Sequence, residues 1–274
     1  MTYATGSAPT VSTCQVVHEG HVGDLPLNRE NAERLLASGK FFWIDVQQPT
    51  EADVAVLSDV FRFHPLALED SEQFGQRPKL DDYDDFVLMV VYGAAGDGDR
   101  LVEVHCFYSE RFLVTVHRYE APALADVRRR YKQRKEPADE AILLLYRVVD
   151  ALVDSFFPIL AAVDDRIDDL EDQTFLRASD EDLQEIFAMK RLLVDMRKVV
   201  TPQRDMFASV MGQVSVVPGM TSEGERYFRD VYDHLIQISD LIETYRDMLT
   251  SSMEVFLSTV SNRLNVVMKQ LTWL

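Results

Sequence analysis

The stretch YFRDVYDHLIQISDLIETYRDML, residues Tyr227–Leu249, is the strongest indicator of the fold, because its apolar residues recur at alternating steps of three and four. This spacing places them on one face of an α-helix and is the seam along which a long helix packs against another. The stretch that follows, Ser251–Leu274, contains neither Gly nor Pro. We therefore predict one helix from Glu223 to Leu274, about 50 residues and about 75 Å long. A single globular core is narrower than that, so the helix must leave the domain or pack against other copies. The seam residues are Phe228, Val231, Leu235, Ile238, Ile242, Tyr245 and Leu249.

A second face of the same helix carries mostly hydroxyl and amide groups, with almost no fixed charge after Glu254. Its members recur every three or four residues: Glu254, Ser258, Ser261, Asn265, Met268 and Thr272. An ordinary solvated helix face carries Lys and Glu instead. Two interpretations stay open on spacing alone: a helix bundle around a water-filled axis, or a coiled-coil surface of low charge.

Composition limits the class of partner. The 274 residues are 47% apolar and carry a formal net charge of -18, from 46 acidic and 28 basic residues. Such a chain lacks the basic surface that nucleic acid requires and suits cations, although acidity also serves solubility. The two cysteines, Cys14 and Cys106, form neither a disulfide framework nor a CxxC metal motif. No run of 18 apolar residues is present, so we expect no membrane span within this sequence.

The first half of the chain alternates between strand and helix signals and predicts a mixed sheet flanked by helices. Strands are predicted at Thr13–Val17, Phe41–Val46, Phe86–Ala94, Leu101–Tyr108 and Phe112–His117. Helices are predicted at Asn28–Ser38, Thr50–Val60 and Pro65–Glu72. The second half is helical, with predicted helices at Ala121–Arg134, from Pro137 to about Asp172, and at Asp180–Met211, where Pro202 should bend the last of them.

These signals divide the chain into four parts. Residues 1–12 form a polar tail that we expect to be disordered, and residues 13–135 form the α/β domain. Two long acidic helices occupy residues 136–218, and the final helix occupies residues 223–274.

Enzyme signatures are absent from the sequence: there is no HExxH, Walker loop, GxSxG or GxGxxG. We therefore expect no enzymatic activity. The candidate chemistry is cation binding, because Mg²⁺ prefers carboxylate oxygens and retained water. Three acidic pairs are candidates, and for each a solvated surface is the alternative: Glu69 with Asp70, Asp150 with Asp154, and Asp230 with Asp233.

Four long motifs resemble the cytosolic domain of the CorA magnesium transporters. The first is WIDVQQPTEADVAVLSDVFRFHPLALEDSEQFGQRPKLDDYDDFVLMVVY, and the others are LLYRVVDALVDSFFPIL, YFRDVYDHLIQISDLIETYRDML and STVSNRLNVVMKQLT. The resemblance runs from about Phe41 to the last residue and is specific, because the motifs occur in the family's order.

The resemblance implies a homopentamer whose cytosolic part is a funnel: an α/β domain, two acidic helices and an extended C-terminal stalk helix. In the family the stalk continues into two membrane helices with a Gly-Met-Asn signature, which this sequence lacks. The chain therefore looks like a soluble piece cut at the membrane surface. In the full-length protein it would lie on the cytoplasmic side of the cell membrane and meet the bilayer only through the missing helices.

The resemblance also implies site residues. Mg²⁺ would bridge neighbouring subunits between Asp70 and Asp230, and a second nearby site would use Glu69 and Asp150. The ion would stabilise the closed state of the channel, so the domain would sense Mg²⁺ and gate its transport. The implied pore-lining residues are Glu254, Asn265, Met268, Leu271 and Thr272.

Three alternatives remain. The same architecture could handle Zn²⁺, Co²⁺ or Ni²⁺, although the sequence shows no thiolate or imidazole cluster typical of a dedicated zinc site. The chain could be a coiled-coil scaffold without ion transport. It could be a metal-dependent hydrolase, which would need clustered His and Asp ligands that are not visible.

Overall fold

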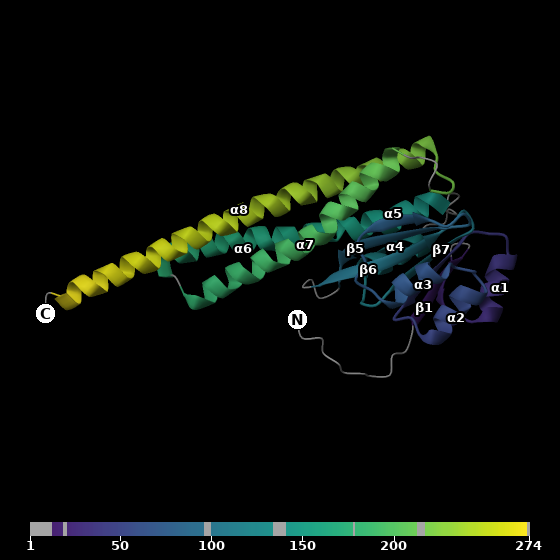
Figure 1. Ribbon diagram of the computed structural model, residues 1–274, viewed down its shortest axis with the longest axis horizontal. Helices are drawn as coiled ribbons and strands as arrows, with labels where there is room; N and C mark the ends of the chain where they lie inside the picture. The colour runs from purple at the N-terminus through teal and green to yellow at the C-terminus, as the bar shows by residue number, and fades with distance from the viewer. Residues whose placement is uncertain are drawn as a thin grey trace. The chain divides into compact units, whose positions relative to one another are not determined.

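A computed structural model describes residues 13–18, 21–95, 100–133, 141–177, 179–212 and 217–272 (Figure 1). The expected tail over residues 1–12 lies outside the described residues. The chain divides into two compact units, the first formed by Met1–Ser155 with Pro202–His234 and the second by Phe156–Thr201 with Leu235–Leu274.

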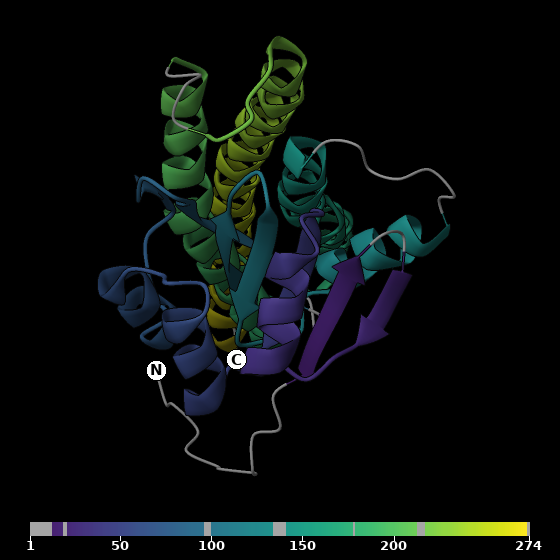
Figure 2. The same ribbon diagram turned by 90° about the vertical axis from the view of Figure 1, so that its right-hand side faces the viewer.

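The first unit is built on a seven-stranded sheet in the order β2-β1-β3-β7-β6-β5-β4. Its strands are β1 (Thr13–His18), β2 (His21–Asp24), β3 (Phe42–Gln47), β4 (Lys79–Asp82), β5 (Val87–Ala94), β6 (Leu101–Tyr108) and β7 (Phe112–His117). Among the strands that the structure describes, only β3 and β7 pair in parallel and the other pairings are antiparallel, so the predicted mixed sheet is confirmed. The β1–β2 pair forms one edge of this sheet (Figure 2).

The two edge strands β2 and β4 were not predicted. Their sequences, HVGD and KLDD, are short and rich in charge or glycine, and most of their residues are exposed or half-buried. Such strands form because a neighbour offers a hydrogen-bonding edge, and they carry no apolar alternation of their own.

Three short helices, α1 (Arg29–Ala37), α2 (Glu51–Asp59) and α3 (Pro65–Glu72), begin where local capping chemistry starts them. Asn28 caps α1 by accepting a hydrogen bond from the backbone of Asn31. Thr50 and Asp53 form a capping box on α2, and Pro65 stands at the first position of α3. All three helices lie within one or two residues of their predicted bounds.

Two further helices, α4 (Pro122–Gln133) and α5 (Ala141–Asp154), pack on one face of the sheet, where both contact β5. Side chains alternate between the faces of a strand, so Glu103, His105 and Phe107 of β6 point together to one face. That face meets the region of α3, since His105 contacts Ser71 and Phe107 stacks on Phe63 at 4.2 Å.

The prediction of one uninterrupted helix from Pro137 to about Asp172 is wrong. Residues 134–140 lie outside the described residues, and beyond them the structure has α5 followed by α6 (Phe156–Arg177), interrupted at Ser155. Pro158 has no backbone N–H to donate to the carbonyl of Asp154, so the hydrogen-bond ladder breaks there. The Ser155 hydroxyl instead donates to the carbonyl of Leu152 at 2.5 Å and accepts from the backbone N–H of Ala94 at 2.7 Å.

The second unit is a set of packed helices: α6, the first part of α7 (Asp180–Gly212) and most of α8 (Ser222–Thr272), which lie side by side (Figure 1). Ion pairs join them, with Arg166 on α6 to Glu185 on α7 at 2.5 Å and Arg197 on α7 to Glu243 on α8 at 3.0 Å. The 51 residues of α8 confirm the long final helix. All seven predicted seam residues, from Phe228 to Leu249, are buried.

Candidate divalent cation site

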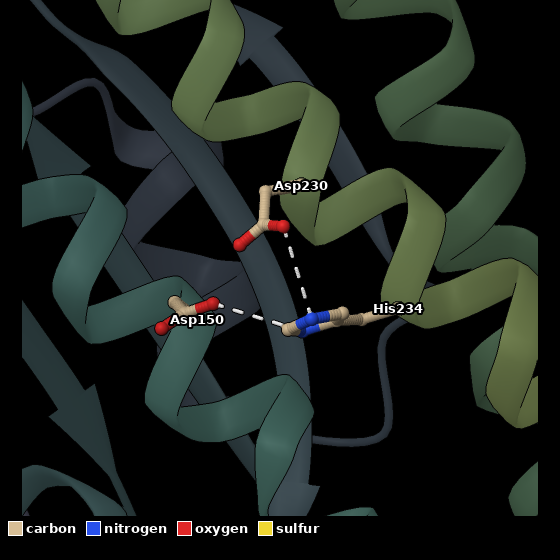
Figure 3. Close-up of side chains that lie close together, drawn as sticks. All are labelled: Asp150, Asp230 and His234. Atoms are coloured by element: carbon tan, nitrogen blue, oxygen red, sulfur yellow. Dashed lines mark ion pairs between the residues drawn. The ribbon is translucent and has the colours of Figure 1, made fainter.

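An acidic cluster forms where α5 and α8 come together in the first unit. Asp150 on α5 and Asp230 and His234 on α8 each point one ligand atom toward the others, and these atoms all lie within 4.8 Å of one another (Figure 3). Nδ1 of His234 lies 3.8 Å from Oδ1 of Asp150, and Nε2 lies 3.9 Å from Oδ1 of Asp230. The imidazole thus stands between the two carboxylates.

In each of the two helices, the residues of this cluster are spaced so that they lie on one face. Asp150 and Asp154 are one turn apart on α5, and Asp230 and His234 are one turn apart on α8, so each pair shares a face. Asp154 joins the cluster through its Oδ1 atom, 2.8 Å from Nδ1 of His234.

Aromatic contacts hold the two helices together beside the cluster. The ring of Tyr146 on α5 packs on the ring of Tyr227 on α8, with centroids 4.8 Å apart. The Tyr146 hydroxyl donates a hydrogen bond to Oδ2 of Asp230 at 3.4 Å. This tyrosine therefore helps to orient an acidic side chain of the opposite helix.

The environment of Asp150 suits a bound cation. Burial and the nearby charge of Asp154 raise the pKa of Asp150 to about 6. Its Oδ1 atom is buried and accepts no hydrogen bond from any described residue. A carboxylate in this state gains from any positive charge placed against it, because burial removes the water that would otherwise stabilise it.

Solvent reaches this carboxylate from one side. Asp150 lines a cavity of about 410 Å³ between α4 and α5, together with Ala123, Val127, Arg130, Tyr131 and Arg147. A cation that keeps part of its water shell could approach Asp150 there.

The donor set fits a divalent cation. Carboxylate oxygens are the ligands that Mg²⁺ prefers, and an imidazole nitrogen also suits Co²⁺, Ni²⁺ and Zn²⁺. Asp150, Asp230 and His234 would hold the ion, with Asp154 close by.

Glu69 and Asp70 lie elsewhere in the first unit, on α3. Oδ2 of Asp70 accepts a hydrogen bond from Nζ of Lys79 at 2.7 Å, and Lys79 also pairs with Asp81 at 2.7 Å. Glu69 is exposed and accepts a hydrogen bond from the side chain of Gln73. Of the four predicted metal-binding residues, Asp150 and Asp230 therefore lie together within one chain. Glu69 and Asp70 are not part of this cluster.

The predicted pore-lining residues lie in the last turns of α8. The side chains of Glu254, Asn265 and Met268 are exposed. Leu271 and Thr272 belong to the helix, but their side chains lie outside the described part of the chain.

His234 and Tyr146 were missed as site residues. His234 follows Asp230 by four residues, so the signal of a shared helix face was present in the sequence. The position of Tyr146 opposite Asp230 depends on the packing of α5 against α8, which sequence spacing does not reveal.

Residues 38–274 match the family of cation transporters described as CorA-like Mg2+ transporter protein. The chain therefore belongs to the CorA-like Mg²⁺ transporter family.

Two relatives and one solved structure illustrate the match. The chain is 35% identical over 240 residues to the cobalt/magnesium transport protein CorA of Thermotoga maritima, covering 84% of this chain and 67% of that protein. It is 33% identical over 237 residues to the putative metal ion transporter YfjQ of Bacillus subtilis, covering 85% and 72%. The fold matches the complete structure of the CorA magnesium transporter from Methanocaldococcus jannaschii with a TM-score of 0.79 and 22% identity, over 97% of this chain and 82% of that one.

Among the described residues, no helix combines the length and the apolar character needed to cross a membrane.

Proposed function

We propose that this chain is the cytosolic, Mg²⁺-sensing and gating domain of a homopentameric divalent cation channel. The acidic cluster of Asp150 and Asp230, joined by His234, is the observation that carries the proposal. Family membership supports the transported class of ion, because the relatives are described as transporters of magnesium, cobalt or metal ions.

In this proposal a neighbouring copy completes the cluster: its Asp70 faces Asp230, and its Glu69 forms a second site nearby with Asp150. Two carboxylates about 4 Å apart repel by about 4 kcal/mol at an effective dielectric constant near 20. A divalent cation between them turns this repulsion into attraction. The bound ion therefore favours the closed, symmetric arrangement, and loss of the ion when cellular Mg²⁺ falls lets the copies separate.

The final turns of α8 line the conduction path of the open channel in this proposal. Asn265 and Thr272 offer neutral oxygens to a hydrated ion, and Met268 and Leu271 form an apolar constriction. Glu254 adds a ring of negative charge on the cytosolic side.

The proposal is tested by the double substitution Asp70→Ala with Asp230→Ala. In the unchanged protein, Mg²⁺ should slow proteolysis, because bound ions hold the copies together. The double variant should lose this protection or require at least roughly tenfold more Mg²⁺ for it. The measurement is the proteolysis rate over a Mg²⁺ titration.

A matched control replaces two exposed aspartates that belong to none of the candidate acidic pairs, Asp82→Ala with Asp240→Ala, which changes the net charge equally. The control should keep the protection. If the Asp70 and Asp230 double variant is protected as well as the control, these two residues have no sensor role.

Cation binding should also weaken below about pH 6. The pKa of Asp150 is raised to about 6, so this carboxylate is ionised at neutral pH and becomes protonated as the pH falls through that value. A protonated carboxyl does not hold the ion, and binding must then expel the proton. The Mg²⁺ concentration for half-maximal protection should rise between pH 7 and pH 5. In an Asp150→Asn variant this rise should be smaller, and an equal rise would assign it to other groups.

A second candidate function is the sensing and transport of a transition-metal cation such as Co²⁺. The imidazole of His234 in the cluster favours it, because nitrogen ligands suit Co²⁺ better than Mg²⁺. The same titration with Co²⁺ in place of Mg²⁺ separates the two, since the sensed ion should protect at the lower concentration.

A further inference from the structure

Three buried polar side chains form a continuous chain between the sheet and α3. Oγ of Ser71 lies 3.0 Å from Nδ1 of His105, and Nε2 of His105 lies 2.7 Å from Oε1 of Glu103. Ser71 is 3% exposed, His105 0% and Glu103 7%. We call these three residues the buried triad.

Glu103 is anchored at the far end of this triad by the turn that follows α3. Its carboxylate accepts hydrogen bonds from the backbone N–H groups of Gly75 and Gln76. Burial alone would raise the pKa of Glu103, but the hydrogen bond and charge of His105 and the two backbone donors outweigh it and lower the pKa. Glu103 is therefore a carboxylate, and His105 donates to it through a proton on Nε2.

The turn at Gly75 and Gln76 is held against the sheet by further contacts. Gly75 has a φ of 107°, a conformation that side chains other than glycine rarely adopt. The hydroxyl of Tyr92 on β5 donates to the carbonyl of Gln76 at 2.6 Å. The segment from Ser71 to Gln76 is thus fixed to the sheet at three points.

The order Ser–His–Glu is that of some hydrolytic enzymes, but the burial of this serine excludes a nucleophilic role. A nucleophile must meet its substrate, and the Ser71 hydroxyl is covered by protein and also lies 3.2 Å from the carbonyl of Ala67 within its own helix. The buried triad is therefore a means of holding a helix.

The helix it holds carries two of the proposed cation ligands. Ser71 directly follows Glu69 and Asp70 in α3, which has only eight residues. A helix this short has little stability of its own and takes its orientation from tertiary contacts. Ala67, Leu68 and Ser71 are the buried side chains of α3, and Ser71 is the one that contacts the sheet through a polar atom. Ser71 therefore helps to set the rotation of α3 about its axis, and with it the direction in which Glu69 and Asp70 point.

We propose that the buried triad of Ser71, His105 and Glu103 positions Glu69 and Asp70 for cation binding, and that the chain needs it for its full affinity for Mg²⁺. These are positioning residues, since none of them touches the ion. The inference rests on the proposed function, because it assumes that Glu69 and Asp70 are cation ligands.

The test replaces Ser71 with alanine and measures the Mg²⁺ concentration for half-maximal protection from proteolysis. Ser71→Ala removes the link between α3 and His105, together with the contact of the hydroxyl with the Ala67 carbonyl inside the helix, and leaves the pairing of His105 with Glu103 in place. We expect this concentration to rise by roughly tenfold, as for other residues that orient metal ligands without touching the metal. Glu103→Gln, which keeps the shape of the side chain but weakens its hold on His105 and the turn, should shift it in the same direction.

A control of matched stability separates positioning from general destabilisation. Val17→Ala removes buried apolar volume from β1, away from α3, and should lower the melting temperature while leaving the Mg²⁺ dependence unchanged. The exposed change Ser58→Ala on α2 should alter neither property. If Ser71→Ala and Glu103→Gln leave the Mg²⁺ dependence unchanged, or if Val17→Ala shifts it as much as they do, the inference is wrong.

The same experiment distinguishes the two levels of proposal. If the unchanged protein shows no response to Mg²⁺, the proposed sensing function fails and this inference falls with it. If the unchanged protein responds and the two triad variants respond equally well, the sensing function stands and only the positioning role is overturned.

Discussion

Replacing Arg128 with methionine should lower the free energy of unfolding by about 3 kcal/mol, the lower end of the range for breaking a buried ion pair. Arg128 on α4 pairs with Asp45 on β3, a carboxylate that is only 4% exposed. Without the guanidinium, Asp45 keeps His117 at 3.1 Å and the Thr115 hydroxyl as partners, which limits the loss. Urea unfolding at neutral pH measures the change.

The exposed arginine next in sequence provides the control. Arg129 pairs with Asp126 at the surface, where ion pairs contribute little, so Arg129→Met should change the unfolding free energy by less than about 1 kcal/mol. An Arg128→Met protein as stable as the Arg129→Met protein would show that the buried pair makes no net contribution.

The pH dependence of the same network has a definite sign. Burial alone would raise the pKa of Asp45, but His117, Arg128 and Thr115 outweigh it and lower the pKa. Its contribution to stability is therefore present above the ordinary aspartate value of about 3.9 and is lost as the pH falls through the lowered value. Removal of Arg128 leaves this pKa less depressed, so acid unfolding of Arg128→Met should begin at a higher pH.

His117 acts in the opposite direction along the pH scale. Burial would lower its pKa, but the charge and hydrogen bond of Asp45 outweigh this and raise it. The contribution of His117 to stability is present below the ordinary histidine pKa of about 6.5 and is lost as the pH rises through the raised pKa. The network as a whole is thus most stabilising between about pH 4 and pH 6.5.

The substitution Gly93→Ala should also be strongly destabilising, by about 1–3 kcal/mol. A Cβ atom at this position in β5 would lie 2.8 Å from the backbone carbonyl of Leu152 and 2.9 Å from the Ser155 hydroxyl. The carbonyl belongs to the backbone of α5 and cannot turn aside, so the helix end must move away from the sheet. Thermal unfolding measures the loss.

The matched control is Gly23→Ala in β2, where an added Cβ meets nothing within 4 Å. It should leave the melting temperature nearly unchanged. Equal effects at both positions would mean that the loss of glycine flexibility, and not the close approach of α5 to β5, determines the result.

Local information in the sequence is sufficient for the features of the fold that depend on neighbouring residues. The seam from Phe228 to Leu249 is buried as its spacing predicts, because the period of a helix alone decides which residues share a face. The bounds of α1 and α2 and the five apolar strands are predicted for the same reason, since each depends on neighbours within a few residues.

Predictions that depend on a distant part of the chain were incomplete or wrong. The strands β2 and β4 exist because β1 and β5 offer them an edge. The break at Ser155 couples a local cause, Pro158, to a contact with Ala94 that lies 61 residues away in the sequence. The sequence shows the proline, but it does not show that the Ser155 hydroxyl is hydrogen-bonded to strand β5.

The candidate site also combines features that the sequence predicts with features that depend on packing. Asp150 and Asp230 are candidates from two separate acidic pairs, and the resemblance assigns them to different sites; their separation of 80 positions along the chain gives no physical reason to pair them. The packing of α5 against α8 brings them together and adds His234 and Tyr146. Periodicity and capping act over one or two helical turns and can be read from the amino acids alone. Which helix faces which, and therefore which side chains meet, depends on close packing across the whole folded chain and cannot be read from the spacing of residues.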